Sequence, residues 1–217
     1  MIYWPSVYLL RCFTKLYFRC ESFGRENLPS NGPCICVINH NSIMDIFAMA
    51  MIVKSRVHTM VKHTMFEVPI LKYWLRAVHM FPVVRNSSDF TSFSHAIDLL
   101  QKGEILFMAP EGTRIRIEGQ EKRPRTGFVR LAHIAGCPVI PIAVWGTDKA
   151  MPVGQRLPIP TKIAVKIGEP IRLKKVELTP EKKHLLQEQA DRVMGIINTM
   201  LDDLDKQFNK KSRNEHQ

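Results

Sequence analysis

The chain has 217 residues, enough for one domain with a sizeable hydrophobic core. Its 31 lysines and arginines outweigh 20 aspartates and glutamates, and the formal charge of +11 favours an anionic partner such as a bilayer surface, a phosphorylated substrate or an acidic carrier protein. The basic residues are dispersed without a nucleic-acid-binding signature, and the five cysteines form neither a disulfide framework nor a ligand pattern, so we exclude nucleic acid and zinc and expect a reducing compartment.

Residues 1–19 combine many aromatic and aliphatic side chains with Arg11, Lys15 and Arg19. No apolar run approaches the roughly 18 residues that a spanning helix needs, and no cleaved signal peptide is evident. This composition predicts a helix that lies in the membrane interface, although an ordinary core helix can share it.

The rest of the chain alternates between strand and helix patterns. Apolar runs or alternating patterns at residues 34–38, 56–61, 81–84, 105–109, 137–144 and 157–168 predict strands. Helices are predicted for residues 45–54, 69–76, 91–102, 126–135 and 179–208. We therefore expect an α/β domain over residues 27–208, a central mixed sheet flanked by helices. A membrane-associating segment at residues 1–26 precedes it, and a polar, disordered tail at residues 209–217 follows it.

A histidine and an aspartate stand five residues apart just after the strand predicted at residues 34–38. Ser42 and Asp45 form a capping-box pattern, which predicts a helix start here. Five residues turn a helix by about 500°, so His40 can meet Asp45 only from the loop before the helix. Asp45 can then accept a hydrogen bond from one imidazole nitrogen and leave the other as a base. A helix cap beside an unrelated loop histidine remains the alternative.

Three further segments accompany this pair. Residues 81–85 are an apolar run that ends in Arg85, and residues 105–109 lead into the turn Pro-Glu-Gly-Thr-Arg at 110–114. Residues 137–144 form a third apolar run. With Asn39, His40 and Asp45, these blocks resemble the glycerolipid acyltransferase family over about residues 27–170. The chain departs from the family's usual pattern at three positions beside the expected acceptor pocket: His79 replaces the usual glycine, Ala109 a phenylalanine and Ile115 a serine.

The resemblance implies direct acyl transfer from a thioester of coenzyme A or of acyl-carrier protein, with no further cofactor. The acceptor is the free hydroxyl of 1-acyl-sn-glycerol-3-phosphate (lysophosphatidate), and the product is phosphatidate. His40 is expected to be the base and Asp45 its support, with oxyanion donors among the amides of residues 41–44. The residues expected to bind substrate are Lys62, Arg85, Glu111, Gly112, Thr113, Arg114 and Arg125; of these, Glu111 is expected to order the loop rather than touch an anion.

Two alternatives remain open at this level. One is an acyltransferase of the same family that uses another lysophospholipid, or glycerol-3-phosphate itself. The other is a non-catalytic membrane-binding protein that uses the basic surface and residues 1–19. In each case the expected location is peripheral or monotopic on the cytoplasmic face of a membrane, with an anionic bilayer as partner.

Overall fold

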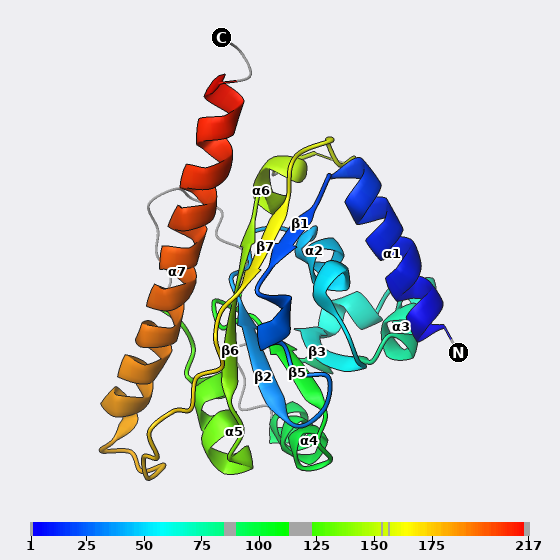
Figure 1. Cartoon of the computed structure of the whole chain (residues 1–217). Coiled ribbons are helices and arrows are strands. Elements are labelled where there is room, and N and C mark those ends of the chain that lie inside the picture. The colour runs from blue at the N-terminus through cyan, green and yellow to red at the C-terminus, as the bar shows by residue number, and fades with distance from the viewer. Residues whose placement is uncertain (1, 85–89, 113–122, 153, 156, 215–217) are drawn as a thin grey trace.

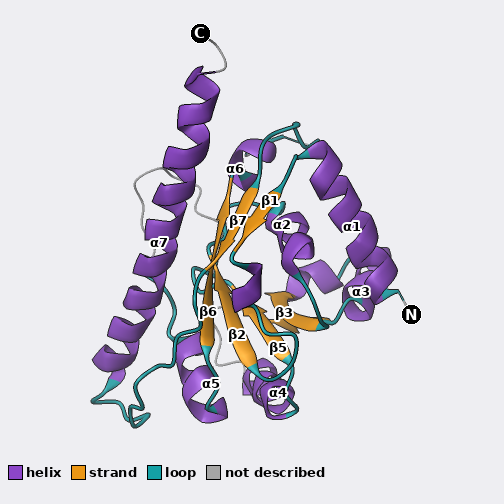
Figure 2. Cartoon of the chain, viewed as in Figure 1, coloured by secondary structure: helices purple, strands orange, loops and turns teal. Residues whose placement is uncertain are grey.

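The computed structural model describes residues 2–84, 90–112, 123–152, 154–155 and 157–214, with side chains described as far as Asn209. A seven-stranded mixed sheet runs through the middle of these residues, with helices on both faces (Figures 1 and 2). The α/β class and the mixed sheet that the sequence predicts are therefore confirmed.

The sheet has the strand order β1-β7-β6-β2-β5-β3-β4. The strands are β1 Glu21–Phe23, β2 Cys34–Ile38, β3 Val57–Lys62, β4 Met80–Val83, β5 Ile105–Met108, β6 Val139–Trp145 and β7 Ala164–Ile167. From β6 to β4 every neighbouring pair is parallel, whereas β7 runs antiparallel to β6, and β1 pairs with β7 in parallel. Parallel strands that are covered on both faces explain the uninterrupted apolar sequence of β2.

Two helical layers cover the sheet. The first contains α1 Tyr3–Tyr17, α2 Asp45–Ile52 and α3 Pro69–Ala77, and the second contains α4 Phe90–Gln101, α5 Gly127–Ala135 and α7 Lys183–Asn214 (Figure 1). Short helical turns lie at η1 Arg25–Asn27, η2 His63–Phe66 and α6 Thr147–Ala150. Each layer forms its own hydrophobic core with the sheet, and β2 contributes alternate side chains to the two cores.

The cysteines at positions 34 and 36 of β2 point into the same core, as the alternation of a strand predicts. Cys137 is buried as well. Burial raises the pKa of Cys36 well above its usual range and that of Cys137 to about 11, because a thiolate is poorly solvated there. These thiols are packing residues, which agrees with the interpretation of the Cys-x-Cys pattern as core.

Helix α1 has one buried side and one exposed apolar side. Tyr3 and Val7 are buried, and the Arg11 guanidinium donates to the carbonyls of Ala50 (3.0 Å) and Val53 (2.6 Å) at the end of α2. Arg11 thus satisfies free carbonyls of a helix end instead of facing a headgroup. The opposite side exposes Leu16, with 79% of its surface accessible. In the part of the chain that the structure describes, no helix has the length and apolar character needed to cross a bilayer.

Most elements begin and end within two residues of the sequence prediction, but α7 begins at Lys183 instead of residue 179, and three further differences stand out. The strand expected at residues 157–168 is ordered as β7 only from Ala164, because Pro158 and Pro160 lack the amide hydrogens that a strand ladder uses. Strand β1 is three residues long, too short for a periodic signal. Helix α7 continues to Asn214, so the helix end expected at Phe208 is wrong. Residues 209–214 contain no glycine or proline to stop it.

His79 occupies a backbone position that suits glycine. Its φ is +60°, in the left-handed region, and its ring packs against Tyr3 (centroids 5.1 Å apart) and His58 (5.0 Å). His79 lies at the amino end of β4, opposite the end that leads to Arg85, and it is not among the residues that line the cavity described below. Val78, Met80 and Tyr3 do line that cavity, so His79 lies next to its wall without forming part of it, and the positive φ accounts for the glycine that is usual here.

We expect the variant His79→Gly to be more stable than His79→Ala by about 1 kcal/mol. Both variants remove the ring, so the difference isolates the cost of a Cβ at positive φ. Urea unfolding of the two proteins measures it, and equal stabilities would contradict the argument.

Burial lowers the pKa of His79 and of His58. The folded state therefore favours the neutral rings. In the wild-type protein, the free energy of unfolding is expected to decrease as pH falls below the ordinary histidine pKa of about 6.5, because the unfolded chain then binds protons more readily than the folded one.

Candidate active site

The sequence blocks meet at one edge of the sheet. Strands β6, β2, β5, β3 and β4 are parallel, so their carboxyl ends lie at the same edge. His40 follows β2, Glu111 and Gly112 follow β5, and Lys62 ends β3. Helix α2, after β2, covers one face of the sheet, whereas α5, after β5, covers the other. Ligands bind at such a change of direction in open α/β sheets.

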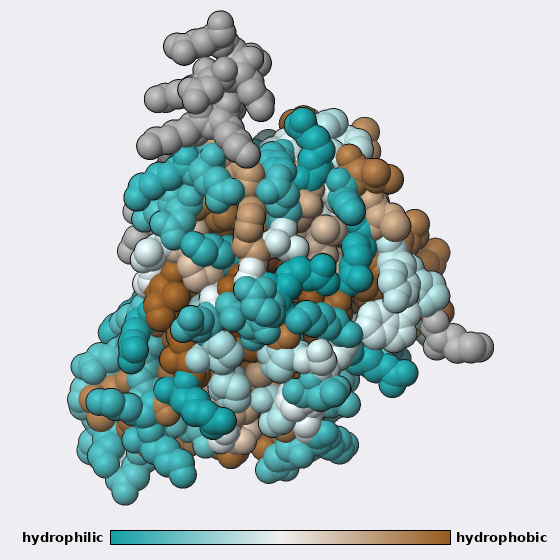
Figure 3. Space-filling view, viewed as in Figure 1, coloured by the Kyte–Doolittle hydropathy of each residue, from teal (hydrophilic) through white to brown (hydrophobic). Residues whose placement is uncertain are grey.

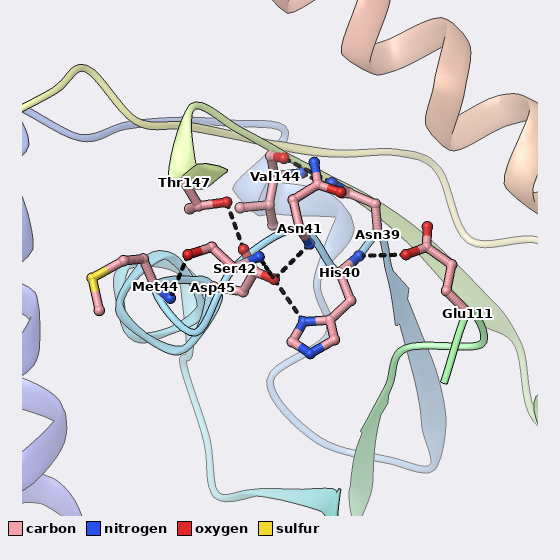
Figure 4. Close-up of polar contacts among 9 residues, drawn as sticks. All are labelled: Asn39, His40, Asn41, Ser42, Met44, Asp45, Glu111, Val144 and Thr147. Atoms are coloured by element: carbon pink, nitrogen blue, oxygen red, sulfur yellow. Dashed lines mark hydrogen bonds and ion pairs between the residues drawn. The ribbon is translucent and has the colours of Figure 1, made fainter. Parts of the chain in front are cut away.

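His40 and Asp45 are hydrogen-bonded at this edge. The distance from His40 Nδ1 to Asp45 Oδ2 is 2.8 Å (Figure 4). His40 lies on the loop after β2 and Asp45 is the first residue of α2, as the spacing argument requires. The Asp45 side chain is 4% exposed and that of His40 is 24% exposed. The carboxylate is therefore shielded from water while the imidazole remains reachable.

The partners of Asp45 fix the tautomer of His40. Oδ2 also accepts from the amides of Asn41 (3.1 Å) and Ser42 (3.2 Å), and Oδ1 accepts from the hydroxyl of Thr147 (2.6 Å). An ionised carboxylate only accepts hydrogen bonds, so His40 Nδ1 must carry a proton and donate it. The other ring nitrogen, Nε2, then holds a lone pair, and it points away from Asp45 (Figure 4). That nitrogen is the available base.

Half of the predicted capping box is present. The Ser42 amide donates to Asp45 as predicted, but Ser42 Oγ accepts from Met44 N (3.3 Å) and not from the Asp45 amide. The amides of Asn41, Ser42 and Met44 all donate to these side chains. Three of the four amides at residues 41–44, where the sequence predicts oxyanion donors, are therefore engaged by the side chains of Asp45 and Ser42.

Two further side chains hold the loop that carries His40. Asn39 donates to Val144 O (2.8 Å) and accepts from Val144 N (2.7 Å), so its amide extends the pairing of β2 with β6 by one step. Glu111 is buried and its Oε2 accepts from the His40 amide (3.1 Å). Glu111 thus orders the loop of the base, in line with the expectation that it orders a loop rather than contacts an anion.

Two cations line the same cavity as this pair. Lys62 ends β3 and lines the same cavity as His40. The Arg125 amide donates to Pro110 O (3.0 Å), and the Arg125 guanidinium lies against Gly112, where an added Cβ would stand 2.9 Å from Nε. Gly112 has a φ of +68°, so this turn requires glycine for its backbone and for the arginine above it. The predicted residues Arg85, Thr113 and Arg114, and the departure at Ile115, lie outside the described residues.

A large, mostly apolar cavity opens at His40. Its volume is about 1310 Å³, and His40, Asp45, Lys62, Arg125 and Ala109 are among its lining residues. The apolar part of the lining comes from α1, α2, α3 and the sheet, with Val7, Leu10, Met49, Val57, Leu75 and Phe107 as examples. Among the described residues, no three His, Cys, Asp or Glu side chains gather as a metal ion requires. A base, cations and hydrocarbon-lined space therefore share one cavity.

Sequence reasoning missed Thr147 and the role of Asn39. Thr147 follows the strand predicted at residues 137–144, and residues just beyond parallel strands gather at one edge, which is the signal that could have indicated it. The bonds themselves could not be foreseen, because Thr147 and Asp45 are 102 positions apart.

Comparisons with known proteins agree with this geometry. A family model described as Acyltransferase matches residues 19–145. A protein of Bacillus subtilis named 1-acyl-sn-glycerol-3-phosphate acyltransferase is 29% identical over 75% of this chain and 79% of its own. A chloroplast protein of Brassica napus with the same activity in its name is 31% identical over 64% of this chain, which spans 40% of that relative. The crystal structure of the 1-acyl-sn-glycerophosphate acyltransferase PlsC from Thermotoga maritima aligns with a TM-score of 0.71 at 26% identity, over 91% of this chain and 79% of that one.

Proposed function

Because the chain belongs to the Acyltransferase family, we propose that it transfers a fatty acyl group from an acyl thioester to the free hydroxyl of 1-acyl-sn-glycerol-3-phosphate. One observation carries the proposal: His40 is oriented by a buried carboxylate, and it lines a cavity whose walls are hydrocarbon and which also contains Lys62 and Arg125. A base, a site for phosphate and room for acyl chains are what this reaction requires.

The proposed reaction uses His40 as a general base. His40 Nε2 takes the proton of the acceptor hydroxyl while its oxygen attacks the thioester carbonyl, and Asp45 stabilises the imidazolium that forms. The tetrahedral intermediate then expels the thiolate, which receives the proton back from His40. The new ester bond replaces the thioester bond, and no acyl-enzyme is needed. Such a base contributes about 10²–10⁴-fold to the rate.

We assign the acceptor phosphate to the cations at the same edge of the sheet. Arg125 and Lys62 line the cavity with His40, and an arginine binds a phosphate through paired charge-assisted hydrogen bonds. The sequence adds Arg85, Thr113 and Arg114 to this set as predictions from the family pattern. Glu111 and Gly112 contribute by holding the His40 loop and by leaving space for Arg125.

The variant Gly112→Ala is expected to raise the acceptor KM by about tenfold, because the new methyl group displaces the Arg125 guanidinium from the position it now holds. The thioester KM is expected to change less. Gly103→Ala is the matched control: Gly103 also has a positive φ, +81°, but an added Cβ there meets nothing within 4 Å. Equal effects of the two variants on the acceptor KM would show that backbone strain, not the arginine, is responsible.

The activity is tested by following free thiol release with lysophosphatidate and a set of acyl thioesters. Coenzyme A and acyl-carrier-protein thioesters are both candidate donors, and the +11 charge suits an acidic carrier. A panel with other lysophospholipids and glycerol-3-phosphate identifies the acceptor. Turnover only with another acceptor would move the proposal to that lipid. Lipid binding without turnover of any thioester would instead support a non-catalytic membrane protein.

We also propose that the protein acts as a peripheral protein on the cytoplasmic face of an anionic membrane. Helices α1 and α3 both line the cavity, and Trp74 Nε1 donates to Ser6 Oγ (3.2 Å) between them. Their outer sides expose Leu16 and Ile70, which are 79% and 86% accessible. Apolar side chains gather along the edge of the molecule where α1 lies (Figure 3). A bilayer against this surface would bring the lipid acceptor next to the cavity.

Because α1 packs into the core, point substitutions test the membrane contact better than truncation. The double variant Leu16→Glu, Ile70→Glu is expected to lose co-sedimentation with anionic liposomes. The control Ile134→Glu, Leu178→Glu adds the same charge at sites 43% and 45% exposed near α5 and α7, on the other side of the sheet, and is expected to keep it. High salt should weaken wild-type binding. Equal binding by both variants would place the contact elsewhere.

A further inference from the structure

The hydroxyl of Thr147 is the feature that the proposed reaction has not used. Thr147 is fully buried and begins α6, directly after Gly146. Its Oγ1 donates to Asp45 Oδ1 at 2.6 Å. Gly146 has a φ of +84°, and an added Cβ there would stand 2.3 Å from the carbonyl oxygen of Lys162. The backbone before Thr147 therefore turns in a way that glycine alone permits, and this turn aims the hydroxyl at Asp45.

We infer that Thr147 is a positioning residue for the base: its hydroxyl fixes the rotation of the Asp45 carboxylate and so the orientation of His40. Oδ2 of Asp45 has three donors, all from the loop of residues 40–42. Within the described part of the chain, Thr147 is the one residue that donates to Oδ1. Without it, the local loop alone would set the rotation of the carboxylate. The inference rests on the proposed function for its kinetic consequence and on the geometry for its structural one.

The same corner of the fold holds the loop at both ends. Asn39, the residue before His40, is hydrogen-bonded to Val144 in β6. Asp45, which follows the loop, is hydrogen-bonded to Thr147, three residues after Val144. The loop that carries His40 is thus hydrogen-bonded at two points to Val144 and Thr147, at and just after the carboxyl end of β6 (Figure 4). A general base loses efficiency steeply when it is displaced by about 1 Å, so a clamp on its supporting carboxylate affects the chemical step.

Two substitutions separate the hydroxyl from the shape of the side chain. Thr147→Val keeps the branched shape and removes the donor, and it is expected to lower kcat about tenfold or more with each KM within about twofold. Thr147→Ser keeps the donor and is expected to stay within about threefold of wild-type kcat. Thr14→Val is the matched control: Thr14 is also fully buried, and its hydroxyl donates to the carbonyls of Leu10 (2.6 Å) and Phe47 (3.3 Å) and not to the Asp45 carboxylate.

The expected pattern is a loss of kcat in Thr147→Val, recovery in Thr147→Ser, and wild-type kcat in the folded Thr14→Val protein. Wild-type kcat in Thr147→Val would overturn the inference. So would a kcat in Thr147→Ser as low as that in Thr147→Val, because the methyl group and not the hydroxyl would then be what matters. All assays use the full chain and the acceptor with the highest turnover in the acceptor panel.

A double-variant cycle keeps the inference testable even if the proposed acceptor is wrong. In an Asp45→Ala background the Thr147 hydroxyl has lost its carboxylate, so adding Thr147→Val is expected to cost little further stability in urea unfolding. In the wild-type background the same change leaves Oδ1 buried without its donor and is expected to destabilise clearly. Additive losses would mean that Thr147 does not act through Asp45. Unfolding needs no substrate, so this result is independent of the proposed function.

Discussion

The variant His40→Ala is expected to lower the acyl-transfer rate at least about 100-fold while the protein stays folded, since the loss of a general base has that magnitude. The side chain of His40 is partly exposed and its ring bonds to Asp45 alone among the described side chains, so its removal costs little packing. The initial rate of thiol release at saturating concentrations of acceptor and thioester gives kcat.

His184→Ala is the matched control for that experiment. His184 is exposed on α7, and its ring is hydrogen-bonded to the Glu181 carbonyl (3.0 Å). This variant is expected to keep wild-type kcat. Near wild-type turnover in folded His40→Ala would rule out His40 as the base. If His40→Ala does not fold, His40→Gln replaces it in the test, because glutamine fills a similar space without a basic nitrogen.

The variant Asp45→Asn is expected to lower kcat by at least about 100-fold with a smaller change in stability. An asparagine can turn its oxygen towards His40, Asn41 and Ser42 and its NH₂ group towards the Thr147 hydroxyl, which can also accept. The hydrogen-bond geometry is then conserved, but the negative charge that stabilises the imidazolium is lost. Activity close to that of the wild type would mean that Asp45 acts as a helix cap and not in the reaction.

The local features of the site could be predicted from the sequence because short-range rules determine them. The run Cys34–Ile38 is bounded by Pro33 and Asn39, so β2 has the predicted ends. The five-residue spacing of His40 and Asp45 admits a hydrogen bond only with His40 on a loop, and the structure has that arrangement. Lys62 lies at the carboxyl end of β3, where the alternating pattern before it ends.

The bonds that fix the site could not be predicted, because they join segments whose separation depends on the strand order. Asn39 and Val144 are 105 positions apart, and Glu111 lies 71 positions from His40. Nothing in a local pattern shows that β6 lies beside β2 or that β5 lies on its other side. The backbone angle of His79 explains why glycine is usual at that position, and a local sequence pattern does not reveal such an angle.

The attachment of the His40 loop to β6 has a consequence for the order in which the protein is made. A ribosome delivers His40 and Asp45 about a hundred residues before Val144 and Thr147. Until β6 has paired with β2, the loop lacks both of its attachments, because each joins residues more than a hundred positions apart. A growing chain therefore carries His40 and Asp45 before either attachment can form, and we expect thiol release only once β6 has paired with β2.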